Sequence, residues 1–158
     1  MPALRRIRGF SALEAVVVVA ILALLAGITI PRFAAARDGR ITTRLLCSLS
    51  LLRAAVDDYW TQHDGYPGPD AAAFVAQLTG RTDRRGLPAA EGDIGARGPY
   101  VRDGIPDNPV SGGNSVKFVE SMPHEADGTS AWIYCPASGE LRANTPGEAP
   151  EGLPWFHL

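Results

Sequence analysis

One stretch of the chain, residues 10–31, limits what the sequence can fold into more than any other. It reads FSALEAVVVVAILALLAGITIP, is apolar or small at nearly every position, and carries a single charge, Glu14. A helix of about 20 such residues crosses the hydrocarbon core of a bilayer. A carboxylate near the start of such a span is costly to bury, so Glu14 is a candidate functional residue. The sequence therefore predicts a transmembrane helix over residues 10–31.

The leader before this stretch, residues 1–9, reads MPALRRIRG and contains three arginines and no acidic residue. Positive charge beside a first span keeps that side cytoplasmic, so the rest of the chain is expected outside the cytoplasm. A cleaved signal peptide also begins basic and then apolar, and the small residues 34–36 could mimic its cleavage site. The apolar run is long for a signal peptide, and helix-favouring sequence continues beyond it. A retained anchor is the favoured interpretation.

The spacing of four residues around the span carries a family resemblance. The leader ends in Gly9, the aromatic Phe10 follows, Glu14 is the fifth residue after the glycine, and the apolar run ends at Pro31. This arrangement resembles the type IV prepilins and the type II secretion pseudopilins. The resemblance implies that prepilin peptidase cuts between Gly9 and Phe10 and methylates the new amino terminus of Phe10. It also implies that the helix stays in the mature protein and serves assembly.

Glu14 has a physical role in this interpretation. Cleavage creates a positive amine on Phe10, one helical turn from the carboxylate. In a filament of packed helices, Glu14 of one subunit would neutralise the amine of a neighbour, and the resemblance implies this use. An unpaired buried ion costs several kcal/mol, so the pair would fix the register between subunits. The alternative is that Glu14 only lies at the headgroup boundary. Pro31 is expected to kink the helix as it leaves the membrane.

Residues 32–64 continue as an amphipathic helix within an extracytoplasmic domain over residues 32–158. Apolar side chains at spacings of three and four form one stripe, which should bury against a sheet: Ile41, Leu45, Leu49, Leu52, Val56 and Tyr59. The sequence Asp-Gly-Tyr-Pro at residues 64–67 is a stop signal. The predicted helix therefore ends there.

Loops and a small sheet are expected over residues 65–158. Residues 71–79 predict a short helix, with Asp70 as its N-cap and Gly80 just past its end. Residues 115–122, 129–135 and 140–144 predict strands, and residues 136–139 predict a tight turn between the last two. Trp155 and Phe156 are expected to dock the tail. The predicted fold class is α+β, with a long amino-terminal helix packed on a small antiparallel sheet.

The two cysteines, Cys47 and Cys135, leave two interpretations open. No C-x-x-C pair or Cys/His cluster is present, which argues against a zinc site. Outside the cytoplasm a disulfide between them is permitted. Cys47 lies roughly opposite the apolar stripe, which argues against an easy bond within the chain and favours two unpaired thiols.

Motifs for catalysis are missing from the sequence. No G-x-S-x-G, P-loop, H-E-x-x-H or G-x-G-x-x-G pattern occurs, and the three histidines have no carboxylate or serine pattern beside them. The prediction is that the chain is not an enzyme and needs no cofactor. Members of the resembled family bind calcium in a carboxyl-terminal loop. The loop oxygens that could do so here do not match an EF-hand, and the alternative is that they are turn residues: Asp103, Asp107, Asn108 and Asp127.

The charge balance argues against nucleic acid as a partner. Net charge is −2 and the sequence pI is about 5.9, so the chain carries no overall basic footprint. Arginines do gather in one loop region, but acidic residues interleave with them and a solvated loop is favoured. The arginines are Arg81, Arg84, Arg85, Arg97 and Arg102.

The resemblance as a whole implies a homo-oligomeric filament subunit anchored in the inner membrane. Its expected partners are minor pseudopilins or pilins, prepilin peptidase, and an assembly platform with its ATPase. The segments GPYV at residues 98–101 and PDNP at residues 106–109 resemble the major pseudopilin of type II secretion, although the usual Trp-Gly pair is absent. Two alternatives stay open: a type IV pilin for adhesion, motility or DNA uptake, and a permanently anchored extracytoplasmic binding module.

Overall fold

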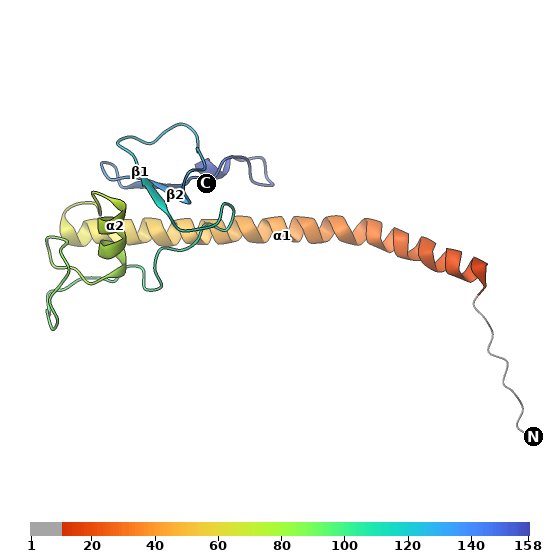
Figure 1. The fold of residues 1–158 in the computed structure, drawn as a ribbon, viewed down its shortest axis with the longest axis horizontal. Coiled ribbons are helices and arrows are strands. Elements are labelled where there is room, and N and C mark those ends of the chain that lie inside the picture. The colour runs from red at the N-terminus through yellow and green to blue at the C-terminus, as the bar shows by residue number, and fades with distance from the viewer. Residues whose placement is uncertain (1–10) are drawn as a thin grey trace, which may run out of the picture. The chain divides into compact units, whose positions relative to one another are not determined.

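A computed structural model describes residues 11–158, with the side chains of residues 27–38 left undescribed. The chain divides into two compact units, Met1–Arg37 and Asp38–Leu158. Helix α1 (Ala12–His63) provides the described part of the first unit and the first element of the second (Figure 1). The backbone is helical through Pro31 and Gly39. Within the described residues, no helix has a stretch both long and apolar enough to cross a membrane. The span predicted over residues 10–31 extends beyond the side chains that the structure describes, and it stays a prediction.

The second unit is an α+β fold built on the carboxyl-terminal half of α1. After α1 come helix α2 (Ala71–Thr79), strands β1 (Val116–Phe118), β2 (Trp132–Cys135) and β3 (Glu140–Ala143), and the short 3₁₀ helix η1 (Trp155–His157). The strands form one sheet in the order β1-β2-β3, on one side of this half of α1 (Figure 1). The α+β class predicted from the sequence is confirmed.

The predicted antiparallel sheet is wrong in one pairing. Strands β2 and β3 form the expected antiparallel hairpin, with Trp132 opposite Ala143 and Tyr134 opposite Leu141. Strand β1 pairs with β2 in parallel, so the sheet is mixed. A parallel pair needs a crossover, and the segment between Phe118 and Trp132 supplies it without a helix. A turn closes the hairpin, in which Gly139 adopts φ 70° and a Cβ would run into the ring of Tyr66.

The core forms where the apolar stripe of α1 meets the sheet. Five of the six predicted stripe residues are buried, and Ile41 is partly buried against them. On the sheet, Trp132 and Tyr134 alternate along β2 and therefore face the same side as their cross-strand partners on β3. Helix α2 adds Phe74, whose ring lies 4.6 Å from that of Tyr134. These contacts join three elements that are distant in sequence into one core.

The ends of the helices follow from local chemistry. The Asp70 side chain accepts a hydrogen bond from the backbone N–H of Ala73, as predicted for an N-cap, and the Gly80 N–H donates to the carbonyl of Ala76. Helix α1 ends at His63, as expected. The residue that turns the chain there is Asp64, with φ 56°, rather than the following glycine. Aspartate tolerates this left-handed conformation better than most residues.

We predict that Leu49→Ala lowers the free energy of unfolding by about 2–5 kcal/mol, because it removes a fully buried side chain and leaves a cavity. Leu49 is 1% exposed, whereas Leu46 on the same helix is 44% exposed. The matched control Leu46→Ala should change stability by no more than about 0.5 kcal/mol. Denaturant unfolding of the purified full chain, followed by tryptophan fluorescence, measures both. Equal losses in the two variants would contradict the predicted core.

Candidate functional site

The first candidate site is the apolar surface of α1 in the first unit. Residues 11–26 are all exposed within the described chain. Four consecutive valines at residues 16–19 point to different sides of the helix, so the apolar surface surrounds it rather than forming a stripe. The large apolar side chains are each 44–75% exposed. They are Leu13, Val16, Val17, Val18, Val19, Ile21, Leu22, Leu24 and Leu25. A contiguous surface of this kind marks an interaction site.

Glu14 stands in the first turn of α1, where it takes part in a capping box with Ser11. The backbone N–H of Glu14 donates to the Ser11 Oγ at 3.2 Å, and the backbone N–H of Ser11 donates to the Glu14 Oε2 at 3.4 Å. Two backbone donors that the helix start leaves unsatisfied are thereby paired. The carboxylate also lies at the positive end of the helix dipole. Sequence reasoning missed Ser11, although the S-x-x-E spacing of residues 11–14 was a readable signal.

The other residues predicted for processing and assembly are placed only in part. Gly9 and Phe10 lie outside the described residues. Pro31 lies within the helical backbone of α1, and its side chain is outside the described set. The predicted cleavage between Gly9 and Phe10 and the predicted role of Pro31 therefore stay predictions.

The four oxygen-bearing residues considered for calcium do not form one site. Asn108 is buried, and its Nδ2 donates to the carbonyl of Ala131 and to the Thr145 Oγ1, both at 2.9 Å. Its Oδ1 accepts from the backbone N–H of Val110 at 2.9 Å. These bonds connect the loop that contains Asn108 to the residue before β2 and to the segment after β3. Within the described residues, no group of three or more His, Cys, Asp or Glu side chains is placed to hold a metal ion.

Asp127 organises the crossover that leads into β2. Its carboxylate pairs with the Lys117 Nζ and accepts from the backbone N–H of Thr129 at 3.0 Å and from the Asn144 Nδ2 at 2.6 Å. These hydrogen bonds, that from Lys117 foremost, hold the pKa of Asp127 well below its ordinary range. The carboxylate thus ties the crossover to β1 and to the end of β3, and its oxygens are occupied by protein donors.

The two cysteines are both free thiols, in agreement with the second of the two interpretations. Cys47 is exposed on the outer side of α1, whereas Cys135 is buried at the end of β2. The Cys135 Sγ donates to the carbonyl of Glu120 at 3.4 Å. A disulfide between Cys47 and Cys135 is therefore not formed.

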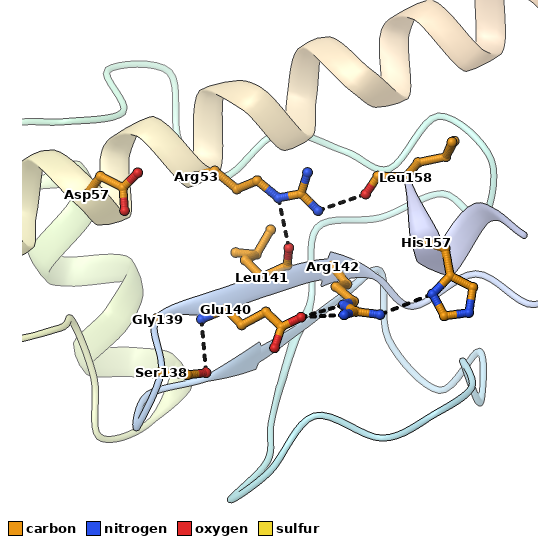
Figure 2. Close-up of a pocket in the computed structure, with 9 residues that line it drawn as sticks. All are labelled: Arg53, Asp57, Ser138, Gly139, Glu140, Leu141, Arg142, His157 and Leu158. Atoms are coloured by element: carbon orange, nitrogen blue, oxygen red, sulfur yellow. Dashed lines mark hydrogen bonds and ion pairs between the residues drawn. The ribbon is translucent and has the colours of Figure 1, made fainter.

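A surface groove of about 490 Å³ lies where the tail, β3 and α1 meet (Figure 2). Arg53 enters it from α1, and its Nε and Nη2 donate to the carbonyls of Leu141 and Leu158 at 3.0 and 2.8 Å. Burial, and secondarily the charge of Arg142, lower the pKa of Arg53. This role of Arg53 is not predictable from the sequence, because an arginine beside the apolar stripe of an amphipathic helix is ordinarily a solvated residue.

A second arginine in the groove, Arg142, also forms hydrogen bonds with other residues of the chain. The Arg142 Nε donates to the Glu140 Oε1 at 2.7 Å, and its Nη1 donates to the His157 Nδ1 at 3.2 Å (Figure 2). Its guanidinium lies 4.9 Å from the centre of the Phe156 ring. Trp155 and Phe156 are buried, as predicted for the tail. The groove is therefore the place where the carboxyl-terminal residues 155–158 pack against α1 and β3.

Comparison of the chain with models of protein families, with curated proteins and with solved structures gives no match. The features of this chain that bear on its function are therefore the apolar segment of α1, Glu14 and the surface of the second unit.

We predict that acid destabilises the folded protein partly through Asp127. The pKa of Asp127 is lower in the folded state than in the unfolded state. Such a carboxylate stabilises the fold at pH values above its unfolded pKa, which is about 3.9. This contribution is lost as the pH falls below that value towards the folded pKa. Asp127→Asn should therefore flatten the loss of stability below about pH 4.

Thermal unfolding of the full chain between about pH 2 and pH 6 measures this effect. The control Asp103→Asn changes an exposed loop carboxylate and should keep the acid sensitivity of the wild type. An unchanged acid limb in Asp127→Asn would show that the network around Asp127 does not act in this way.

Proposed function

We propose that the chain is a structural subunit of a type II secretion pseudopilus or a type IV pilus-like filament. In this proposal it is made as a precursor anchored in the inner membrane, with its amino terminus cytoplasmic and its second unit outside. Prepilin peptidase removes residues 1–9 and methylates Phe10. An assembly platform with its ATPase then moves the subunit into a filament with other copies and with minor pseudopilins or pilins.

The observation that carries the proposal is the surface of α1 at residues 13–25. The second unit completes its core with the stripe from Leu45 to Tyr59, and the apolar residues further towards the amino terminus are exposed in the described chain. Exposing so many large apolar side chains to water is unfavourable by about 25 cal/mol for each Å². A bilayer before assembly and neighbouring helices after it would each cover this surface on all sides.

The position of Glu14 supports the second part of the proposal. It is the one ionisable side chain among residues 11–26 and stands in the first turn of α1. Helices packed side by side would remove its carboxylate from water, and a buried carboxylate without a partner is strongly destabilising. The amine that processing would create on Phe10 of a neighbouring copy supplies a partner of opposite charge. The pair would then select one axial position between neighbours.

A permanently anchored binding module would share the apolar segment, but it would not need Glu14 for assembly. The groove in Figure 2 does not favour this alternative, because residues of the chain itself use it to dock the tail. Removing the charge of Glu14 distinguishes the two proposals, because only a filament subunit would need that charge for assembly.

We predict that Glu14→Gln abolishes filament formation while the subunit still accumulates in the membrane. Glutamine keeps the hydrogen-bonding capacity of the capping box and removes the charge, so helix capping is preserved and pairing with the amine is lost. The matched control Ser11→Ala removes the capping hydroxyl, at about 1 kcal/mol of helix stability, and keeps the charge. It should still form filaments.

The measurement is filament yield by electron microscopy together with subunit content of the membrane by immunoblotting, in cells that contain the assembly machinery. Normal filaments from Glu14→Gln would refute the pairing. A defect in Ser11→Ala as severe as that in Glu14→Gln would assign Glu14 to helix capping instead.

A further inference from the structure

The two outer strands of the sheet differ in what covers their free edges. The sheet has the order β1-β2-β3, so β1 and β3 each have one side without a neighbouring strand. On β3 the Arg53 Nε donates to the carbonyl of Leu141 at 3.0 Å, and the tail packs beside this strand through the hydrogen bond between Arg142 and His157. The chain itself therefore covers the outer edge of β3.

The hydrogen bonds between β1 and β2 show which residues of β1 face its open side. The carbonyl of Ser115 accepts from the backbone N–H of Trp132 at 2.9 Å. The backbone N–H of Val119 donates to the carbonyl of Tyr134 at 3.0 Å. Because the backbone alternates along a strand, every second residue bonds to the same neighbour. The odd-numbered residues from 115 to 119 therefore face β2.

Val116 and Phe118 point their backbone N–H and C=O groups away from β2. Among the described residues, no hydrogen bond to these groups is found. Such an edge is a template for another strand, and proteins often shield one with a charged side chain. The one charge on β1, Lys117, pairs with Asp127 of the crossover instead. Because β1 is short, its edge alone would hold an added strand weakly.

An apolar pocket of about 380 Å³ adjoins the carboxyl end of β1 and provides a second point of attachment. Its lining comes from the segment before α2, from the end of β1 and from the hairpin turn, and all but one of the lining residues are apolar. They are Pro69, Phe118, Val119, Glu120, Pro136 and Ala137. Phe118 belongs both to the open edge and to the pocket, so a strand added along β1 would bring a side chain to this pocket.

Glu120 gives the pocket a negative rim. It is the charged residue of the lining and is exposed. Its backbone carbonyl accepts from the Cys135 Sγ at 3.4 Å, so its main chain is held in place. The ion pairs found in the described part of the chain involve other carboxylates. A basic residue close to an apolar one would complement this rim and the pocket together.

We propose that the edge of β1 and the adjoining pocket bind an extended segment of a different protein. The segment pairs with the free backbone groups of Val116 and Phe118 as an added strand. It places a bulky apolar side chain in the pocket and a lysine or arginine beside Glu120. The inference concerns the second unit alone and does not depend on the proposed function.

A second copy of this chain is a poorer occupant. The antiparallel register that uses Val116 and Phe118 of both copies sets Lys117 opposite itself, and like charges directly opposite are destabilising. The same register brings Asn114 and Ser115 to the pocket of the other copy. Both are polar, so the apolar pocket would stay unfilled.

The probe for this site is the acetylated and amidated peptide Thr-Lys-Val-Leu-Val-Lys-Thr, which reads the same in both directions and so fits an added strand of either direction. It is added to the purified full chain in detergent micelles, and amide hydrogen exchange is followed by NMR. In the free chain the amides of Val116 and Phe118 should exchange faster than those of Lys117 and Val119. Saturating peptide should slow the exchange of Val116 and Phe118 by about fivefold or more. A peptide methylated on its central backbone nitrogens should not.

Variants of the chain separate the backbone contact from the side-chain contacts. Val116→Pro removes an N–H on the open edge, where a strand tolerates proline, and should weaken peptide binding about tenfold. Val116→Ala keeps the N–H and should stay within about twofold of the wild type. Glu120→Lys should weaken binding of the lysine peptide about fivefold and strengthen binding of a peptide with glutamates in place of the lysines. If Val116→Pro fails to fold, hydrogen exchange in the wild type and in Glu120→Lys decides the outcome.

Three results would overturn the proposal. The first is unchanged exchange of Val116 and Phe118 at millimolar peptide, and the second is equal binding of the methylated peptide. The third is slower exchange of the same amides as the protein concentration rises without peptide, which would assign the edge to a second copy. None of these results bears on the proposed filament.

Discussion

The structure of the second unit depends on one packing contact, that between the apolar stripe of α1 and the inner face of β2 and β3. Leu45, Leu49 and Leu52 are buried against Trp132 and Tyr134, and Phe74 of α2 closes the same core. The loops are then fixed by polar pins at its edge: Asn108 holds the loop before β1, Asp127 holds the crossover, and Arg53 holds the tail. Burying one side of this half of α1 leaves the opposite side exposed.

The same helix carries a different pattern at residues 13–25. A stripe of apolar residues is satisfied by one sheet, but an apolar surface on every side needs an environment that surrounds the helix. A bilayer and a bundle of identical helices both provide this. The proposed function, in which lipid covers this helix first and other copies cover it later, would account for both the apolar segment and the charge at Glu14.

Local features of the fold were predictable from the sequence, whereas pairings between distant segments were not. Helix α2 with its cap at Asp70, the stripe of α1, the β2–β3 hairpin and the docking of Trp155 and Phe156 all follow from short-range patterns, and all are confirmed. The parallel pairing of β1 escaped prediction, because strand propensity and alternation do not encode the direction of a partner. The left-handed residue at the end of α1 is Asp64, whereas the sequence favoured Gly65 because glycine most often adopts this conformation.

For the candidate site, composition identified the residues but not their use. Asn108 and Asp127 were candidate calcium ligands because their oxygens lie in loops. In the structure Asn108 bonds to Thr145, which is distant in sequence, and Asp127 pairs with Lys117 of β1. Contacts of this kind cannot be predicted from local sequence. The contact between Ser11 and Glu14 was predictable, because the two residues stand at the spacing of a capping box.

The central claim, that the apolar helix belongs to a processed subunit rather than to a permanent anchor, is tested most directly at the amino terminus of the mature protein. Mass spectrometry of the chain purified from cells with prepilin peptidase should find a protein that begins at Phe10 and carries one additional methyl group on its amino terminus. A mature chain that still begins at Met1, or an unmodified Phe10, would contradict the account.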